Sequence, residues 1–208
     1  MDKNLEVIIR NKNVNSKDKE IRRFNSFEIR AKEEGENKEL YVEGYAATFN
    51  DTTVLYEFDG IEYKEQIDDK AFESADMSDV ILNYNHTGKV VARTRNNTLQ
   101  ISVDSKGLFI RARLDGTEEG RRLYEEIKGG YIDRMSFQFS VQEASYDTEN
   151  YIRTIRKVKK LYDVSAVDIP AYDTTSIVAR DLQAVAKEFE KEKERSLLRK
   201  KLEIMTYL

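Results

Sequence analysis

The sequence predicts a mainly β protein with a few helices, an α+β fold whose antiparallel strands close, or nearly close, into a barrel. Three observations lead to this prediction. Segments of strand-forming residues, several of them alternating apolar and polar, recur at short intervals between residues 26 and 169. One longer helical pattern interrupts them, at residues 116–130. After Pro170, the only proline, the pattern changes to helical spacing within a dense field of charge.

The N-terminal residues 1–22 are polar and charged, and we expect them to form a flexible arm. Alternation begins at "SFEIRAKEE" (26–34) and resumes in "ELYVEGYAATFN" (39–50), where Gly44 interrupts the strand. The next segment, "YEFDGIEYKEQI", carries Asp59-Gly60 between two apolar-polar runs, which is a hairpin signal. These residues therefore predict four strands in succession.

Further strands are predicted in "VILNYN", "KVVARTR", "LQISVDS", "GLFIRARL", "RMSFQFSVQEAS" and "TIRKVKKLYDVSAVDI". The helix between them has Thr117 as its expected N-cap, and Glu118 and Glu119 suit its first turn. Leu123 and Ile127 are four residues apart and are expected to face the sheet.

Residues 181–208 read as a charged helical tail, which leaves residues 23–180 as the folded domain. A helical stripe of apolar residues runs through the tail: Leu182, Val185, Phe189, Leu197, Leu198, Leu202 and Met205. The stripe fits a solvated helix and a scaffold-like or oligomerising tail about equally well.

Composition excludes several kinds of chemistry. The 208 residues include one histidine and no cysteine, which removes disulfides, thiolate catalysis and multi-histidine metal sites within one chain. The net charge of −4 gives no argument for nucleic-acid binding. No apolar run approaches the length of a membrane span, and no cofactor-binding motif is present. We expect a soluble intracellular protein without cofactor or metal.

His86 is the only imidazole, and it follows the apolar strand "VILNYN" at a Thr-Gly turn. A single histidine is more often structural, but one at a strand end can activate a serine or threonine hydroxyl if a carboxylate holds its tautomer. Ser136 is a small polar residue in a very apolar strand, so it is either required for packing or reactive. Asp163 opens a buried strand and needs a partner there. Asp168 is its rival, although turn formation beside Pro170 would also explain it.

Seven segments, in this order, resemble the prohead (capsid-maturation) serine proteases of tailed bacteriophages, which are related to the herpesvirus assemblins. They are "FEIRA", "VEGYAATFN", "EQIDDKAFESA", "VILNYNHT", "VDSKGLFIRARLD", "EGRRLYEEIKGGYIDRMSFQF" and "KLYDVSAVDIPAYDTTSI". The likeness covers roughly residues 27–180. It departs from the family pattern at Thr87, where the family often has Asp, and at Gln138, where the family often has Gly.

This resemblance implies the roles of individual residues. Ser136 becomes the nucleophile, His86 the general base and Asp163 the residue that orients the imidazole. Backbone amides near Ala171 would form the oxyanion hole by analogy with the assemblins.

The resemblance also implies the biological setting. The substrates would be the major capsid protein or its scaffolding segment, and the protease itself. A homo-oligomer, for instance a dimer, is expected, located in the host-cell cytoplasm within the assembling prohead. Two alternatives remain: a non-enzymatic capsid assembly or scaffold module that keeps the fold, and a host-encoded β-rich binding module.

Overall fold

The structure, a computed structural model, describes residues 7–10, 19–35, 39–58, 60–168 and 176–206. The described part is mainly β with two α-helices, as predicted, and also contains one short 3₁₀ helix. Its elements are β1 (Val7–Arg10), β2 (Lys19–Glu34), β3 (Glu39–Thr48), β4 (Thr53–Phe58), β5 (Ile61–Ile67), β6 (Ile81–Tyr84), β7 (Thr87–Arg93), η1 (Thr94–Asn96), β8 (Leu99–Val103), β9 (Gly107–Arg113), α1 (Glu118–Lys128), β10 (Arg134–Asp147), β11 (Ile152–Val167) and α2 (Ser176–Thr206).

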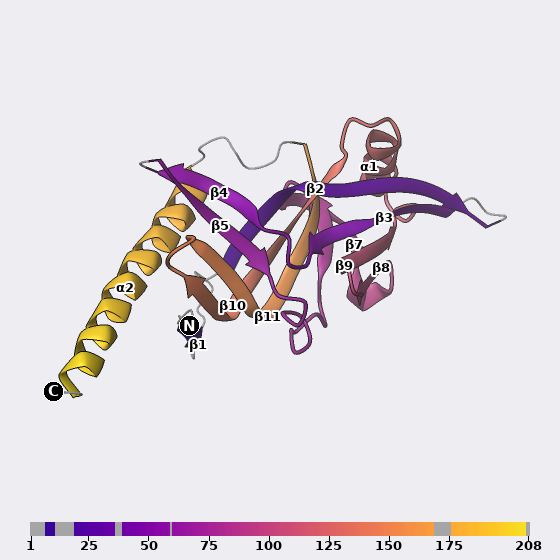
Figure 1. The fold of residues 1–208 in the computed structure, drawn as a ribbon. Coiled ribbons are helices and arrows are strands. Elements are labelled where there is room, and N and C mark those ends of the chain that lie inside the picture. The colour runs from indigo at the N-terminus through magenta and orange to yellow at the C-terminus, as the bar shows by residue number, and fades with distance from the viewer. Residues whose placement is uncertain (1–6, 11–18, 36–38, 59, 169–175, 207–208) are drawn as a thin grey trace.

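All strands belong to one hydrogen-bonded network whose main path runs β4-β5-β11-β10-β2-β3-β9-β8. Off this path, β1 pairs with β10, and β6 pairs with both β11 and β7. The 16-residue strand β2 joins two parts of the network, because its first half pairs with β10 and its second half with β3. Figure 1 shows α1 and α2 at opposite ends of this arrangement.

Two features of the network differ from the predicted antiparallel barrel. Strand β11 pairs in parallel with β5 over Ile152–Ile155 and in parallel with β6 over Asp163–Ala166. In the described residues the main path is open, since its terminal strands β4 and β8 are not paired with each other. Barrel closure is therefore not confirmed.

Local sequence signals correctly predicted one hairpin and the start of one helix. The β4–β5 hairpin pairs Phe58 with Ile61, and Gly60 takes a left-handed φ of 74° that a residue with a side chain seldom adopts. In α1 the Thr117 hydroxyl accepts a hydrogen bond from the Gly120 N–H at 2.9 Å, and the apolar side chains of its inner face are buried.

Two stretches of the expected N-terminal arm, residues 1–22, form strands. Val7–Arg10 forms β1 and pairs antiparallel with β10, and residues 19–22 open β2, also against β10. Strand β10 is long enough, at 14 residues, to offer backbone donors and acceptors to both. Backbone pairing of this kind does not require an apolar sequence.

The predicted C-terminal charged helix is present as α2, which already begins at Ser176. Phe189 is buried and anchors the helix in a cluster of aromatic rings. Its ring centroid lies 4.9 Å from that of Tyr146, 5.6 Å from that of Tyr63 and 6.3 Å from that of Tyr151. Farther along, the apolar side chains are exposed: Leu197, Leu198, Leu202 and Met205. No helix among the described residues has the length and apolarity that crossing a membrane requires.

Replacing the anchor should release α2 from the strands. We expect Phe189→Ala to weaken this contact by about 3 kcal/mol or more, because it deletes a buried aromatic side chain. Hydrogen-exchange mass spectrometry should then show faster amide exchange in α2, with little change in β10 and β11. Leu198→Ala, at a position that is 61% exposed, is the matched control. Equal exchange in the two variants would show that Phe189 does not hold the helix.

Candidate active site

Three neighbouring strands bring a row of polar side chains together. In the β10–β11 register Ser136 lies opposite Ser165, and in the β11–β6 register Ser165 lies opposite Asn83. Asp163 is two residues before Ser165 and therefore points to the same face of β11. Alternate residues such as Phe137 point the other way into the core. The row is polar on one face of strands that are otherwise packed with apolar side chains.

The turn after β6 directs His86 toward this row. Asn85 and His86 both have left-handed backbone conformations, with φ of 50° and 58°. Such values are uncommon for residues other than glycine, although Asn and His tolerate them better than most. The backbone N–H of Asn85 donates to the Ala166 carbonyl at 3.0 Å, and that of His86 donates to Ser165 Oγ at 3.1 Å. These bonds tie the turn to β11.

The imidazole of His86 lies between a carboxylate and a hydroxyl. Its Nδ1 is 2.6 Å from Asp163 Oδ1, and its Nε2 is 2.6 Å from Ser136 Oγ. An ionised carboxylate can only accept, so in the neutral ring the proton belongs on Nδ1. Nε2 is then unprotonated and accepts from the Ser136 hydroxyl. The side chains of His86 and Asp163 are only 5% and 6% exposed, and Ser136 is fully buried.

The sequence left Asp163 and Asp168 as rivals for the imidazole, and the geometry separates them. Asp168 is exposed and accepts from the Tyr84 hydroxyl at 2.7 Å and from Asn85 Nδ2 at 3.0 Å. It thus braces the turn that carries His86, whereas Asp163 contacts the ring itself. The hydrogen bond to Asp168, together with burial, raises the pKa of the Tyr84 phenol.

Two residues of the site were missed by the sequence analysis. Ser165 is fully buried, and its Oγ lies 3.0 Å from Asp163 Oδ1 and 3.2 Å from His86 Nδ1. The same hydroxyl also donates to Asn83 Oδ1 in a short hydrogen bond. The period of two along β11 could have placed Ser165 beside Asp163, but only the pairing of β11 with β6 identifies Asn83. Ala171, predicted near the oxyanion hole, lies outside the described residues.

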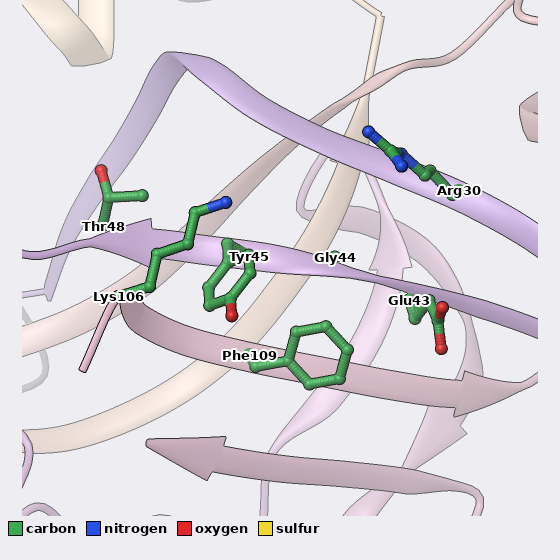
Figure 2. Close-up of a pocket in the computed structure, with 7 residues that line it drawn as sticks. All are labelled: Arg30, Glu43, Gly44, Tyr45, Thr48, Lys106 and Phe109. Atoms are coloured by element: carbon green, nitrogen blue, oxygen red, sulfur yellow. The ribbon is translucent and has the colours of Figure 1, made fainter. Parts of the chain in front are cut away.

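A separate pocket of about 390 Å³ opens on strands that do not carry this site. Figure 2 shows it along β3, with the rings of Tyr45 and Phe109 side by side, 5.2 Å between centroids, and with cationic side chains on either side. The Lys106 ammonium lies 4.3 Å from the centre of the Tyr45 ring. The pocket is lined by Arg30, Glu43, Gly44, Tyr45, Thr48, Lys106 and Phe109. None of the residues around His86 contributes to it.

Comparison with known proteins gives one match to a protein family. A family model described as caudovirus prohead serine protease matches residues 25–188, a range that contains Ser136, His86 and Asp163. Among solved structures, the chain is similar to the bacteriophage T4 capsid assembly protease, with 15% identity and a TM-score of 0.47. That match covers 72% of this chain and 96% of the other. No curated protein matches the chain. The assignment rests on the family match alone.

The imidazole tautomer tests which carboxylate faces the ring. Because His86 is the only histidine, ¹⁵N-histidine labelling gives one imidazole in the NMR spectrum. The native chain should show a protonated Nδ1 and an unprotonated Nε2. Asp163→Asn should move the proton to Nε2, because the new amide can donate to Nδ1.

Asp168→Asn is the matched control, since it makes the same chemical change on a carboxylate that does not contact the ring. It should keep the native tautomer. A native tautomer in Asp163→Asn, or a reversed one in Asp168→Asn, would contradict the assignment of Asp163.

Proposed function

The chain belongs to the caudovirus prohead serine proteases, and on this premise we propose that it is a serine endopeptidase acting through Ser136, His86 and Asp163. The observation that carries the proposal is the continuous hydrogen-bonded chain from the Asp163 carboxylate through the imidazole to the Ser136 hydroxyl. Ser136 lies in β10, Asp163 lies in β11 and His86 lies in the turn between β6 and β7. A reactive serine needs both a base and a group that orients the base.

The first half of the reaction forms an acyl-enzyme. Ser136 Oγ attacks the scissile carbonyl carbon while His86 Nε2 takes the hydroxyl proton. The imidazolium that results is stabilised by the Asp163 carboxylate on Nδ1. When the tetrahedral intermediate collapses, the C–N bond breaks and Nε2 returns the proton to the leaving amine. One new ester bond to Ser136 and one free amine are the products of this half.

The second half releases the acyl group. A water molecule takes the place of the amine, loses a proton to Nε2 and attacks the ester carbonyl. Collapse of the second intermediate returns the proton to Ser136 Oγ and frees the carboxylic acid. Because Ser136 is fully buried in the free chain, groups that cover it have to move before a peptide carbonyl can reach Oγ. Backbone amides near Ala171 are our candidates for the oxyanion hole.

The family sets the biological context of the proposal. We propose that the substrates are the major capsid protein, through its scaffolding segment, and the protease itself, within the assembling prohead in the host cytoplasm. The exposed apolar residues at the end of α2 suit a scaffold-facing or dimerising role of the tail. A capsid assembly module that keeps this fold without turnover is the alternative, and it would not depend on the Ser136 hydroxyl.

Removing one oxygen tests the proposal directly. Ser136→Ala should abolish cleavage of co-expressed capsid protein, with a fall in kcat of about 10⁴-fold or more, because no other hydroxyl can replace the nucleophile. Gel electrophoresis of the capsid protein measures the outcome.

Ser140→Ala provides the matched control. Ser140 is also fully buried in β10, and its Oγ has no hydrogen-bond partner in the described structure. This variant should cleave normally. Persistent cleavage by Ser136→Ala would refute the assignment of Ser136 as the nucleophile. Absence of cleavage by the native chain would favour the capsid assembly module.

A further inference from the structure

We propose that Ser165 is a positioning residue that holds His86 in its productive arrangement between Asp163 and Ser136, with Asn83 orienting its hydroxyl. This inference rests on the proposed function, because it concerns the imidazole that would act as the base. Its effect on the reaction is exerted through His86, the residue that it holds.

One hydroxyl meets His86 at two places and Asp163 at a third. Ser165 Oγ accepts from the His86 backbone N–H at 3.1 Å and lies 3.2 Å from the ring Nδ1. It also lies 3.0 Å from Asp163 Oδ1, the same oxygen that faces Nδ1 at 2.6 Å. The backbone and the ring of His86 thus share a single acceptor atom. Since Ser165 is fully buried, bulk solvent does not reach these contacts.

The bond to the His86 backbone matters because that backbone is strained. Two successive residues, Asn85 and His86, have positive φ, a conformation that needs support from the surrounding structure. The Asn85 N–H is held by the Ala166 carbonyl, and the His86 N–H is held by Ser165 Oγ. Without the second bond, the His86 N–H would lose its acceptor at the point where the chain directs the imidazole toward Ser136.

Asn83 settles where the Ser165 proton goes. A hydroxyl has one proton, and both Asn83 Oδ1 and Asp163 Oδ1 are within its reach. Donation to Asn83 Oδ1 leaves the Oγ lone pairs facing His86, where the backbone N–H and the ring N–H can use them. Asn83 is itself almost fully buried and lies directly opposite Ser165 in the β6–β11 register. The cross-strand pair therefore keeps the hydroxyl in one orientation.

A fixed Ser165 hydroxyl matters because the imidazole has to keep its position while its charge changes. In the proposed reaction the ring gains and loses a proton on Nε2 twice per turnover, and each transfer requires the ring to stay aligned with Ser136. Displacement of a catalytic group by about 1 Å can lower the rate by about 100-fold. Ser165 limits that displacement from the side of the ring opposite to Ser136.

The test combines kinetics with the NMR signal of the only histidine in the full-length chain. We expect Ser165→Ala to lower kcat about 100-fold with KM within about twofold, because positioning and not binding is impaired. The His86 backbone amide should exchange about fivefold faster, as expected for the loss of one ordinary hydrogen bond. Ser140→Ala removes an equally buried serine hydroxyl and should leave both quantities at their native values.

The two readouts separate failure of this inference from failure of the proposed function. Native kcat or native His86 exchange in Ser165→Ala would overturn the positioning role. If the native chain cleaves no capsid protein, the proposed function is wrong, and the NMR comparison alone decides whether Ser165 holds His86.

Asn83→Ala covers the case in which Ser165→Ala does not fold. It leaves Ser165 in place and should lower kcat about tenfold, again with KM within about twofold, because the hydroxyl loses its fixed orientation. A native kcat in this variant would overturn the part assigned to Asn83.

Discussion

The structure depends on the register of β10, β11 and β6, because only that register puts one histidine between two side chains that are 50 and 77 positions away from it. A strand turns its side chains to alternate faces, so a slip of β11 by one residue would turn Asp163 into the core and Val164 toward His86. The apolar residues on the opposite face oppose such a slip, because Val164 and Ala166 of β11 are fully buried. They share that face with Phe137 and Phe139 of β10, which are also fully buried and are stacked with 4.8 Å between centroids. Packing on one face thus fixes the hydrogen-bonded row of polar side chains on the other.

Burial gives the hydrogen-bonded chain its strength and also restricts it. Charge-assisted bonds such as that between His86 and Asp163 are stronger where water is excluded, but a buried carboxylate without partners is costly. Asp163 meets this condition through the imidazole, whose Nδ1 lies 2.6 Å from its Oδ1. Asp168, on the exposed side, is satisfied by Tyr84 and Asn85 instead. The two aspartates are five positions apart but have different structural roles, one on the ring and one on the turn.

The sequence predicted what depends on neighbouring residues. Three predictions rest on local patterns and match the structure: the hairpin turn at Gly60, the helix N-cap at Thr117 and the alternation of side chains around Ser136. Parallel pairing of β11 with β5 and β6 brings together segments more than 80 positions apart, and no local pattern encodes it. For the same reason Asn83 escaped notice, since its proximity to Ser165 exists only in the folded sheet. The motif resemblance supplied the link between His86, Ser136 and Asp163 that composition and periodicity could not.

The central claim is that His86 makes Ser136 a nucleophile, and chemical labelling measures it most directly. A fluorophosphonate reacts with a serine only when its hydroxyl is activated, and peptide mapping by mass spectrometry locates the adduct. The account predicts one adduct, on Ser136, in the native chain, and its loss in His86→Ala. Ser140 and Ser165 are equally buried but do not face His86 Nε2, so they should stay unmodified. An adduct on another serine, or an undiminished adduct on Ser136 in His86→Ala, would contradict it.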